Sequence, residues 1–343
     1  MSSQRFPRTV VVLNRSGIGD LVWHLPYFEA MARHSAHGRV TVIARPSCHA
    51  ADLLAGTPWV EQVIEFDYKL RGTATRGTKH RSIFAQLRFV ASLRRERFDR
   101  VFIFAGRFYF PALMMLAGIP ERAGFGFGFA GRMFLNRPPY IKRYCGPGSW
   151  VYPEATEFAK AHGFVSSPVR PHLEISDASL ETADTMLGAI PENRIAFAIG
   201  SSESRKQWGA TRFSELTRLL CEHGRSVVLI GGPAEREMGD EILAALPPQL
   251  RERVLLVAQP SVLVSAALVS RCALCVGNDT GMLNVAAACD VPTIGLFGAT
   301  QALQHDPLIE GVSASSMREI AVEDVFRAIT GHHAWLKQEI SSK

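Results

Sequence analysis

Short runs of apolar residues, many of them β-branched, alternate with longer stretches of helical periodicity along most of this chain of 343 residues. Parallel strands cannot be joined by a tight hairpin, and the crossover between them is usually a helix. The alternation therefore predicts an α/β fold built on parallel sheets. The runs that predict strands are Thr9–Leu13, Val40–Ala44, 60–66 and 101–105 in the first half, and 195–199, Ser226–Gly231, 254–257, 273–276 and Thr293–Phe297 in the second.

A break near the middle of the chain separates two such series. Between Val169 and Leu180 the periodicity is lost and Pro171 interrupts the chain, before residues that are typical of a helix start. We predict two Rossmann-like, doubly wound domains, 1–170 and 171–321, and a tail, 322–343, whose helix over 322–340 packs back on the first domain. Doubly wound sheets bind ligands where their strands end, so the site is expected in a cleft between facing domains, on loops that follow strands.

Composition indicates a folded, soluble protein with anionic partners. Hydrophobic residues make up 47% and charged residues 20% of the chain, and the formal charge of +6 favours phosphates, acidic glycolipids or nucleic acid as partners. We see no secretory signal and no apolar run long enough to span a bilayer, so a cytoplasmic location is expected. The six cysteines are scattered, as reduced thiols are, and Cys272 and Cys275 are expected to pack in a core rather than bind a metal.

The segment from residue 273 to residue 288 is the most informative in the sequence. A buried strand ends in Gly277, Asn278, Asp279, Thr280 and Gly281, and an alanine-rich helix follows. Glycines let the main chain approach a ligand, and the N–H groups and dipole of a helix start favour an anion such as a diphosphate. Asp279 would cap the helix or accept hydrogen bonds from sugar hydroxyls. An ordinary capped helix would also explain the Asp-Thr pair.

Two other loops that follow predicted strands carry candidate groups. Ser201 opens a loop with two cations, in which Lys206 could hold a diphosphate and stabilise its departure, although a solvated lysine is the plainer interpretation. After the first strand, Asp20 stands at a helix start, where it would either cap the helix or act as a general base toward an acceptor hydroxyl. The neighbouring candidates for contact with the acceptor are Arg15, Ser16, Gly17 and Gly19.

Three further patterns restrict the kinds of ligand and partner that the sequence allows. The spacing Gly126-x-Gly128-x-x-Gly131 matches a dinucleotide fingerprint, but no β-branched strand precedes it and prolines follow, so a mobile glycine and phenylalanine loop is predicted. No Asp-x-Asp pair occurs, so we expect protein groups rather than a metal to meet a diphosphate. A basic cluster with interspersed phenylalanines fits an anionic glycolipid at a membrane better than nucleic acid, for which no recognised module is seen. Its members are Lys69, Arg71, Arg76, Lys79, Arg81, Arg88, Arg94, Arg95, Arg97 and Arg107.

Together the three loops resemble those of glycosyltransferase family 9, the ADP-heptose:lipopolysaccharide heptosyltransferases, and the similarity spans nearly the whole chain. The matching motifs are Ser-Gly-Ile-Gly-Asp-Leu-Val-Trp-His-Leu-Pro from Ser16, Lys-Gln-Trp from Lys206 with Arg-Phe-x-Glu-Leu from Arg212, and Gly-Asn-Asp-Thr-Gly from Gly277. The resemblance implies a GT-B fold and inverting, metal-independent transfer of heptose from ADP-heptose to a lipopolysaccharide-core acceptor. It implies no cofactor beyond the nucleotide sugar, and peripheral contact with the cytoplasmic face of the inner membrane.

The resemblance also implies roles for single residues. Asp20 matches the catalytic carboxylate, Lys206 matches the phosphate-binding lysine, and Gly232-Pro233-Ala234-Glu235 resembles the segment beside the donor nucleoside, with Glu235 as a ribose contact. Where the family usually has a histidine, this chain has Asn284, which cannot become a cation, so other nucleotide sugars stay open as donors. The expected donor-binding residues are Ser201, Lys206, Glu235, Asp279, Thr280, Gly281 and Asn284. The alternatives are a relative that uses a protein acceptor, a nucleotide-sugar epimerase, or an inactive nucleotide-sugar-binding member.

Overall fold

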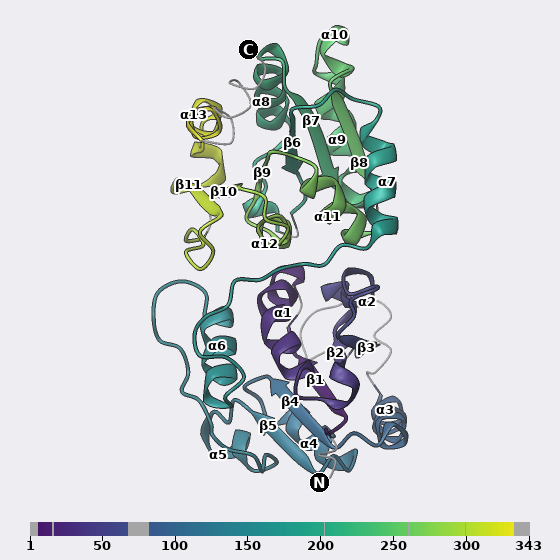
Figure 1. The fold of residues 1–343 in the computed structure, drawn as a ribbon. Helices are drawn as coiled ribbons and strands as arrows, with labels where there is room; N and C mark the ends of the chain where they lie inside the picture. The colour runs from purple at the N-terminus through teal and green to yellow at the C-terminus, as the bar shows by residue number, and fades with distance from the viewer. Residues whose placement is uncertain are drawn as a thin grey trace. The chain divides into compact units, whose positions relative to one another are not determined.

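The chain folds into two compact units, Met1–Pro171 and His172–Lys343, each built on its own parallel sheet. The computed structural model describes residues 6–15, 17–67, 82–201, 203–259, 261–298 and 300–332. Figure 1 shows the first unit in purple to teal and the second in teal to yellow. Within the described residues, none of the helices combines the length and the apolar character that crossing a bilayer requires.

The first unit has a five-stranded sheet in the order β3-β2-β1-β4-β5, and every pair in it is parallel. Its strands are β1 (Thr9–Leu13), β2 (Val40–Ala44), β3 (Val60–Glu65), β4 (Arg100–Phe104) and β5 (Glu121–Gly124). The order reverses between β1 and β4, and that switch point is where a doubly wound sheet opens a crevice for ligands.

Helices cover both faces of this sheet. They are α1 (Ile18–Ala32), α2 (Ala50–Leu53), α3 (Ile83–Glu96), α4 (Tyr109–Leu116), α5 (Gly128–Arg132) and α6 (Val151–Ala161). In Figure 1, α1 and α6 lie on one side of the sheet and α3 and α4 on the other. On the second side, Phe89 of α3 and Phe110 of α4 join Val10, Val12 and Ile103 of the strands in one core cluster.

The second unit has a six-stranded parallel sheet in the order β11-β10-β9-β6-β7-β8. The strands are β6 (Arg194–Ala198), β7 (Ser226–Gly231), β8 (Val254–Ala258), β9 (Leu274–Asn278), β10 (Thr293–Phe297) and β11 (Ile309–Ser313). Its switch point lies between β6 and β9, which are hydrogen-bonded neighbours although a long stretch of chain separates them. The loops after these two strands are therefore the first place to look for a ligand site.

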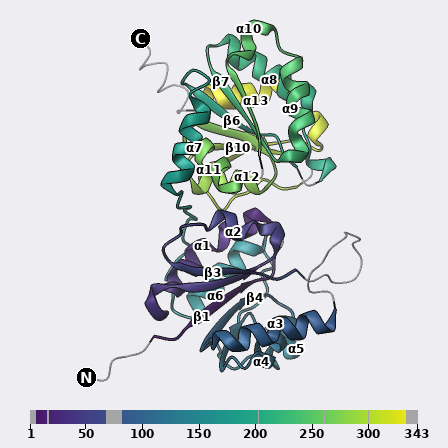
Figure 2. The same ribbon diagram turned by 90° about the vertical axis from the view of Figure 1, so that its right-hand side faces the viewer.

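The helices of the second unit also form two layers. They are α7 (Asp177–Leu187), α8 (Ala210–Glu222), α9 (Arg236–Ala244), α10 (Pro248–Arg251), α11 (Val262–Ser270), α12 (Gly281–Ala288) and α13 (Val322–Gly331). One core cluster takes residues from α8, α9 and α13, and a second takes residues from α7, α11 and α12. Figure 2 shows these two sets of helices on opposite sides of the sheet. Cys272 and Cys275 are buried in the second cluster as free thiols, which confirms that they pack in a core.

The structure corrects the interpretation of the segment around Gly126. A strand, β5, precedes it, and residues Gly128–Arg132 form a short helix rather than a loop. The ring of Tyr140 stands where a Cβ on Gly126 would lie, so that glycine makes room for an aromatic side chain of its own unit.

The predicted helix over 322–340 begins as expected, at Val322, and Val325 and Ile329 pack into the core of the second unit. Residues beyond 332 lie outside the described part of the chain, as do Lys69, Arg71, Arg76, Lys79 and Arg81 of the basic cluster.

Candidate active site

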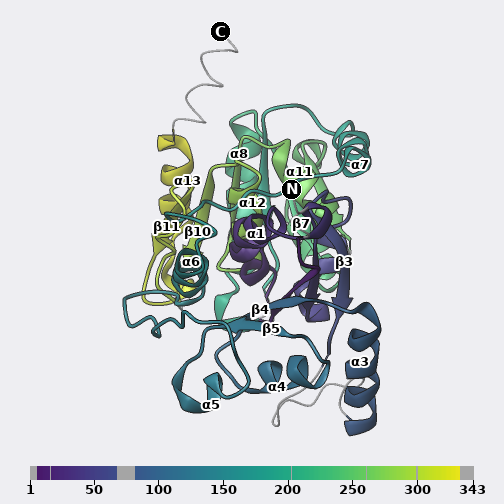
Figure 3. The ribbon, with the colours of Figure 1, turned by 60° about the horizontal axis from the view of Figure 1, so that its bottom comes forward.

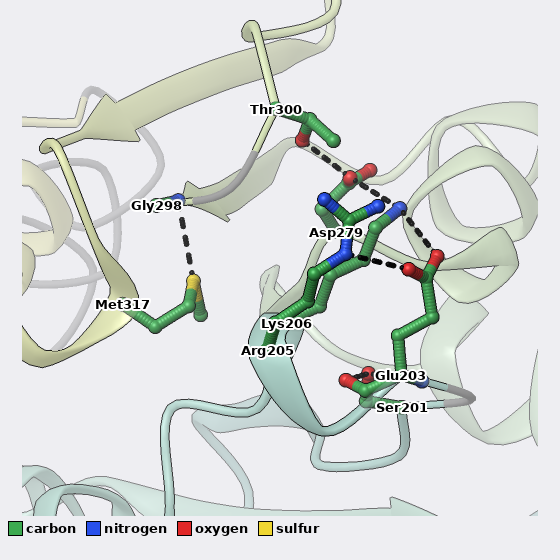
Figure 4. Close-up of polar contacts among 8 residues, drawn as sticks. All are labelled: Ser201, Glu203, Arg205, Lys206, Asp279, Gly298, Thr300 and Met317. Atoms are coloured by element: carbon green, nitrogen blue, oxygen red, sulfur yellow. Dashed lines mark hydrogen bonds and ion pairs between the residues drawn. The ribbon is translucent and has the colours of Figure 1, made fainter.

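Lys206 and Asp279 meet at the switch point of the second unit. Lys206 lies in the loop after β6 and Asp279 in the turn after β9, and the lysine Nζ is 2.8 Å from the carboxylate Oδ2. Figure 4 shows the two side chains pointing toward each other from separate loops. The two candidate donor residues thus share one site because their strands are neighbours in the sheet.

The buried side chain of Asn278 joins the two loops. Its Oδ1 accepts the main-chain N–H of Trp208 at 3.0 Å. Its Nδ2 donates to the carbonyl oxygens of Ile199 at 3.0 Å and Gly200 at 3.2 Å, and to Oε1 of Gln207 at 2.9 Å. Trp208 is itself anchored in the core, where its indole N–H donates to the carbonyl of Ile320. This network fixes the path of the loop that carries Lys206.

Two glycines are required by the geometry of these loops. A Cβ on Gly277 would lie 2.7 Å from the Cβ of Ala198, so β9 can approach β6 this closely only without a side chain. Gly209, which precedes α8, has a φ of +99°, a conformation that residues with a side chain rarely adopt. Both glycines help to hold the loop after β6 beside the turn after β9.

Carboxylates surround the ammonium group of Lys206. Besides Asp279, Glu203 lies 3.5 Å away, and its other oxygen pairs with Arg205 at 2.7 Å. Thr300 donates its hydroxyl to Oδ2 of Asp279 at 2.6 Å, as Figure 4 shows. The idea that Asp279 caps α12 is therefore wrong, because the N-cap residue is Thr280 and the carboxylate of Asp279 bonds to Lys206 and Thr300. The interpretation of Lys206 as a purely solvated side chain is also wrong.

The remaining donor candidates lie close to this pair or on α12. Thr280 makes no side-chain cap bond, and Gly281 opens α12, so the first N–H groups of this helix follow directly after Asp279. Asn284 is buried in the same helix. Ser201 closes its own turn, since its hydroxyl donates to the carbonyl of Glu203 at 2.8 Å.

Glu235 lies in the segment after β7, close to the loop that follows β6. Its Oε2 accepts the main-chain N–H of Gly232 at 2.8 Å, which fixes the start of the segment after β7. A Cβ on Gly200 would lie 3.5 Å from the carboxyl carbon of Glu235. The loops after β6 and β7 are therefore adjacent, and the carboxylate lies between them.

In the first unit, Asp20 lies in the first turn of α1. Its Oδ2 accepts the N–H of Gly17, the N-cap residue, at 3.3 Å, so the carboxylate caps the start of this helix, which is one of the two roles that its position predicts. One turn later, the Nδ1–H of His24 donates to the main-chain oxygen of Asp20 at 2.5 Å. Burial lowers the pKa of His24 to about 3, so this imidazole is neutral and acts as a hydrogen-bond donor within the helix. Gly19 is buried, and Ser16 lies outside the described residues.

A pocket of about 520 Å³ opens beside this turn, at the switch point of the first sheet. Asn14 and Arg15 follow β1 on one side of it, and Ala105, Gly106 and Arg107 follow β4 on the other. The rest of the lining comes from the loop after β2, from the residue that precedes α5, from α6 and from the segment that leads into α6. Those residues are Arg45, Phe127, Arg143, Tyr144, Trp150 and Glu154.

Arg15 lies between an aromatic ring and a carboxylate. Its guanidinium carbon lies 3.9 Å from the ring centroid of Trp150, and its nearest nitrogen is 4.0 Å from Glu154. Burial lowers the pKa of Arg15 from its ordinary value, while the charges of Asp20 and Glu154 oppose that shift. Burial likewise raises the pKa of Glu154, against the N–H of Tyr144 and the charge of Arg15. With four arginines to one glutamate, the pocket favours an anion.

Sequence reasoning missed several residues of these two sites. Trp150 and Glu154 stand four residues apart, a spacing that places two side chains on one face of a helix and could have drawn attention to them. Thr300 and Glu203, which bond to Asp279 and Lys206, carried no comparable signal. Asn278 was recognised only as part of a motif, and its role in joining two loops depends on the strand order.

Comparison with known proteins places the chain in a family. Residues 86–327 match the family model described as Glycosyltransferase family 9 (heptosyltransferase). The lipopolysaccharide heptosyltransferase 2 of Salmonella typhimurium (strain LT2) is 26% identical over 340 residues, which cover 94% of this chain and 89% of that protein.

Solved structures show the same fold. The ADP-heptose lps heptosyltransferase II of Escherichia coli matches with a TM-score of 0.76 at 21% identity, and the match covers 97% of this chain and 99% of that one. The Escherichia coli heptosyltransferase WaaC, solved with ADP-2-deoxy-2-fluoro heptose, matches with a TM-score of 0.71 at 20% identity over 94% and 99% of the two chains. The chain thus has the GT-B fold, and because the family model covers well over half of its residues, it belongs to glycosyltransferase family 9.

Proposed function

We propose that this protein transfers a heptose from ADP-heptose to an anionic lipopolysaccharide-core acceptor, with inversion at the anomeric carbon. Family membership supports a glycosyltransferase, and the relatives that are similar over most of their length are heptosyltransferases. The observation that carries the proposal is the Lys206 ammonium beside the start of α12, where main-chain N–H groups and a cation together suit a diphosphate.

In this reaction Asp20 is the general base. Its carboxylate takes the proton from the acceptor hydroxyl as the oxygen attacks the anomeric carbon. The new glycosidic bond forms while the bond from that carbon to the phosphate oxygen breaks, and ADP leaves with the bonding electrons. Lys206 and the first N–H groups of α12 stabilise the negative charge that develops on the diphosphate.

The arginine pocket of the first unit is the proposed acceptor site. An acceptor that carries phosphates or carboxylates would meet Arg15 and Arg143 there, and its sugar rings would contact Trp150 and Tyr144. Asp20 is close enough to Arg15 to influence its pKa, so an acceptor bound by Arg15 would bring a hydroxyl toward the general base. Arg15 and Gly17 thus remain the proposed acceptor contacts from the first loop.

Donor binding is the first test. ADP-, GDP- and UDP-sugars should be compared for their effect on the thermal midpoint, because a ligand that binds only the folded state raises its apparent stability. We expect ADP-heptose to stabilise the protein most. A clear preference for a GDP- or UDP-sugar would point to the family relative with another donor, for which Asn284 in place of the usual histidine gives a reason.

Transfer is the second test, measured as ADP released on mixing donor with core acceptor. Asp20→Asn should lower turnover by about 10²- to 10⁴-fold, since it removes the general base, while stabilisation by donor alone stays nearly unchanged. Asp177→Asn is the matched control, because Asp177 also lies in the first turn of a helix. Normal turnover by Asp20→Asn would refute the assignment, and donor binding without any ADP release by the wild type would indicate an inactive member.

A further inference from the structure

The side chain of Arg15 is largely buried although it is not hydrogen-bonded within its own unit. It is 17% exposed, and its Nε has no partner among the described residues, nor do these residues supply a hydrogen-bond acceptor for the rest of the guanidinium. An arginine carries five N–H donors, and buried donors are almost always paired in folded proteins. Because Arg15 lines the pocket of about 520 Å³, we expect a ligand in that pocket to supply the acceptors.

The main chain of Arg15 is fixed by a buried cysteine. The thiol of Cys48 donates to the carbonyl oxygen of Arg15 at 3.2 Å. Burial raises the pKa of this thiol to about 12, so the group stays protonated and remains a donor. Cys48 ends the short helix η2 (Pro46–Cys48), which follows β2, and β2 is a neighbour of β1 in the sheet. The loop after β1 is therefore held by the loop after β2.

Two residues of one helical turn contact the other end of Arg15. The ring of Trp150, the N-cap residue of α6, lies 3.9 Å from the guanidinium carbon, and Oε2 of Glu154 lies 4.0 Å from a terminal nitrogen. The main-chain N–H of Glu154 donates to the carbonyl of Trp150 at 3.0 Å, so the first turn of the helix links the two contacts. Oε1 of Glu154 accepts the N–H of Tyr144 at 3.2 Å, which leaves Oε2 to face Arg15.

Helix α6 is in turn fixed on α1, the helix that carries Asp20. The hydroxyl groups of Tyr27 on α1 and Thr156 on α6 are hydrogen-bonded, and the ring centroids of Tyr27 and Tyr152 lie 6.0 Å apart. Figure 3 shows α6 beside α1. The charge of Asp20 raises the pKa of Arg15 against the effect of burial, so the two groups are near each other. An anion that binds to Arg15 would thus have a defined place relative to Asp20.

We propose that Glu154 is a positioning residue, which holds the guanidinium of Arg15 in place for an anionic group of the acceptor. Glu154 is 4% exposed and its Oε2 is shielded from solvent, so it acts through Arg15 and does not touch the acceptor. A cation that is already in place loses less conformational entropy when an anion binds, so the acceptor binds more tightly. This role rests on the transfer reaction proposed above and adds a residue to its acceptor site.

The carboxylate of Glu154 has two opposite effects on a bound anion. Its charge repels the anion, so removal of the charge would by itself strengthen binding. Its hold on Arg15 favours the anion, so loss of that hold would weaken binding. Four arginines in the pocket already outweigh the repulsion of one carboxylate. Among the described residues, only Glu154 places a carboxylate within 4.0 Å of Arg15, so we expect the loss of position to dominate.

The experiment is a double-mutant cycle on the full chain, with ADP release measured at saturating donor while the acceptor concentration is varied. Arg15→Gln should raise the KM for the acceptor about 10- to 100-fold, because it removes a charged donor to an anion. Glu154→Gln keeps the oxygen that accepts the N–H of Tyr144, and it should raise that KM about fivefold with kcat nearly unchanged. In the Arg15→Gln background, Glu154→Gln should raise the KM no further.

Glu157→Gln is the matched control, because Glu157 lies on the same helix but is exposed and pairs with Lys160. It should leave the KM unchanged, and thermal midpoints should show that every variant is folded. If Arg15→Gln does not fold, Arg15→Lys, which keeps the charge without the planar fork, completes the cycle. A lower KM in Glu154→Gln, a lower kcat at unchanged KM, or an equal rise in both backgrounds would overturn the proposal.

Calorimetry without donor separates this role from the transfer reaction. A water-soluble core oligosaccharide that carries phosphates or carboxylates is the probe, and its dissociation constants give the same cycle without turnover. If the wild type releases no ADP while the cycle holds in binding, the transfer reaction is wrong and the positioning role stands. If ADP is released and the two substitutions act independently, the positioning role is wrong and the transfer reaction stands.

Discussion

Replacing Asn278 with aspartate would test whether one buried side chain holds together the loops that carry Lys206 and Asp279. The substitution keeps the shape and the oxygen that accepts the N–H of Trp208. It removes the Nδ2 donor, which now faces the oxygens of Ile199, Gly200 and Gln207 at 2.9 to 3.2 Å. An aspartate here would place an ionised oxygen against three acceptors in a site with no exposed surface.

The loss of stability in this variant follows from the charge of the buried carboxylate. Burial and three facing oxygens raise the pKa of such a carboxyl far above its unfolded value, which is about 3.9. If the folded state keeps the group protonated, the free energy of unfolding falls by about 1.4 kcal/mol for each pH unit above 3.9, or about 5–6 kcal/mol at pH 8 and only about 1.5 at pH 5. This pH dependence is the one expected for an acid whose pKa is higher in the folded state. The loss of unfolding free energy is absent below the unfolded pKa and grows as the pH rises toward the folded pKa.

The assay is thermal unfolding of wild type and Asn278→Asp at pH 5 and pH 8. One kcal/mol shifts the midpoint of a domain of this size by about 2–4 °C, so the variant should lose more than 10 °C at pH 8 and only a few degrees at pH 5. Hydrogen exchange should show faster exchange of the Trp208 amide in the variant. Asn193→Asp, at an exposed position, is the control, and it should change neither the thermal midpoint nor the exchange of the Trp208 amide. Equal midpoints for variant and wild type at pH 8 would refute the reasoning.

Two further predictions concern the charged side chains of the two sites. Lys206→Ala should lower turnover by about 10²- to 10³-fold, as expected when a group that stabilises a developing charge is removed, and Lys206→Arg should lose less activity. The release of ADP at saturating donor measures the turnover of both variants. Near-normal turnover of the alanine variant would contradict the proposed role of the lysine. Burial raises the pKa of Glu154, so the wild type should lose stability as the pH rises from the unfolded pKa of about 4.5 toward the folded value. Glu154→Gln cannot titrate, so its thermal midpoint relative to wild type should increase over that range, and two parallel midpoint curves would count against the buried carboxylate.

The strands that could be predicted are those with an apolar, β-branched run. Four of them, including Thr9–Leu13 and Ser226–Gly231, begin and end where the sequence indicates. The two that were missed, Glu121–Gly124 and Ile309–Ser313, are edge strands with one neighbour each, and their sequences are polar or rich in glycine because less of them is buried. The helix after Phe127 was missed for a related reason, since its strand was not recognised.

The candidate sites could be predicted only one loop at a time. Strand order decides which loops meet, and the alternation of strands and helices does not reveal that β6 pairs with β9 or β1 with β4. The contact of Lys206 with Asp279 follows from the first of these pairs. The pocket that contains Arg15 and Arg107 follows from the second. The sequence therefore indicated which candidate groups each loop carries, but not which residues of other loops they contact.

The charges at the two switch points differ in a way that suits two different anions. In the first unit, four arginines line the pocket against one buried glutamate, so the pocket keeps an excess of positive charge that the proposed acceptor would neutralise. In the second unit, Lys206 already has two carboxylate neighbours, Asp279 and Glu203, and a diphosphate would have to compete with them for the ammonium group. In the proposed reaction, that competition would weaken donor binding but would hold the lysine in place before the donor arrives, and a preorganised cation would stabilise the departing diphosphate without further rearrangement. The first site is thus suited to attract its ligand by charge, and the second to place one cation where charge develops.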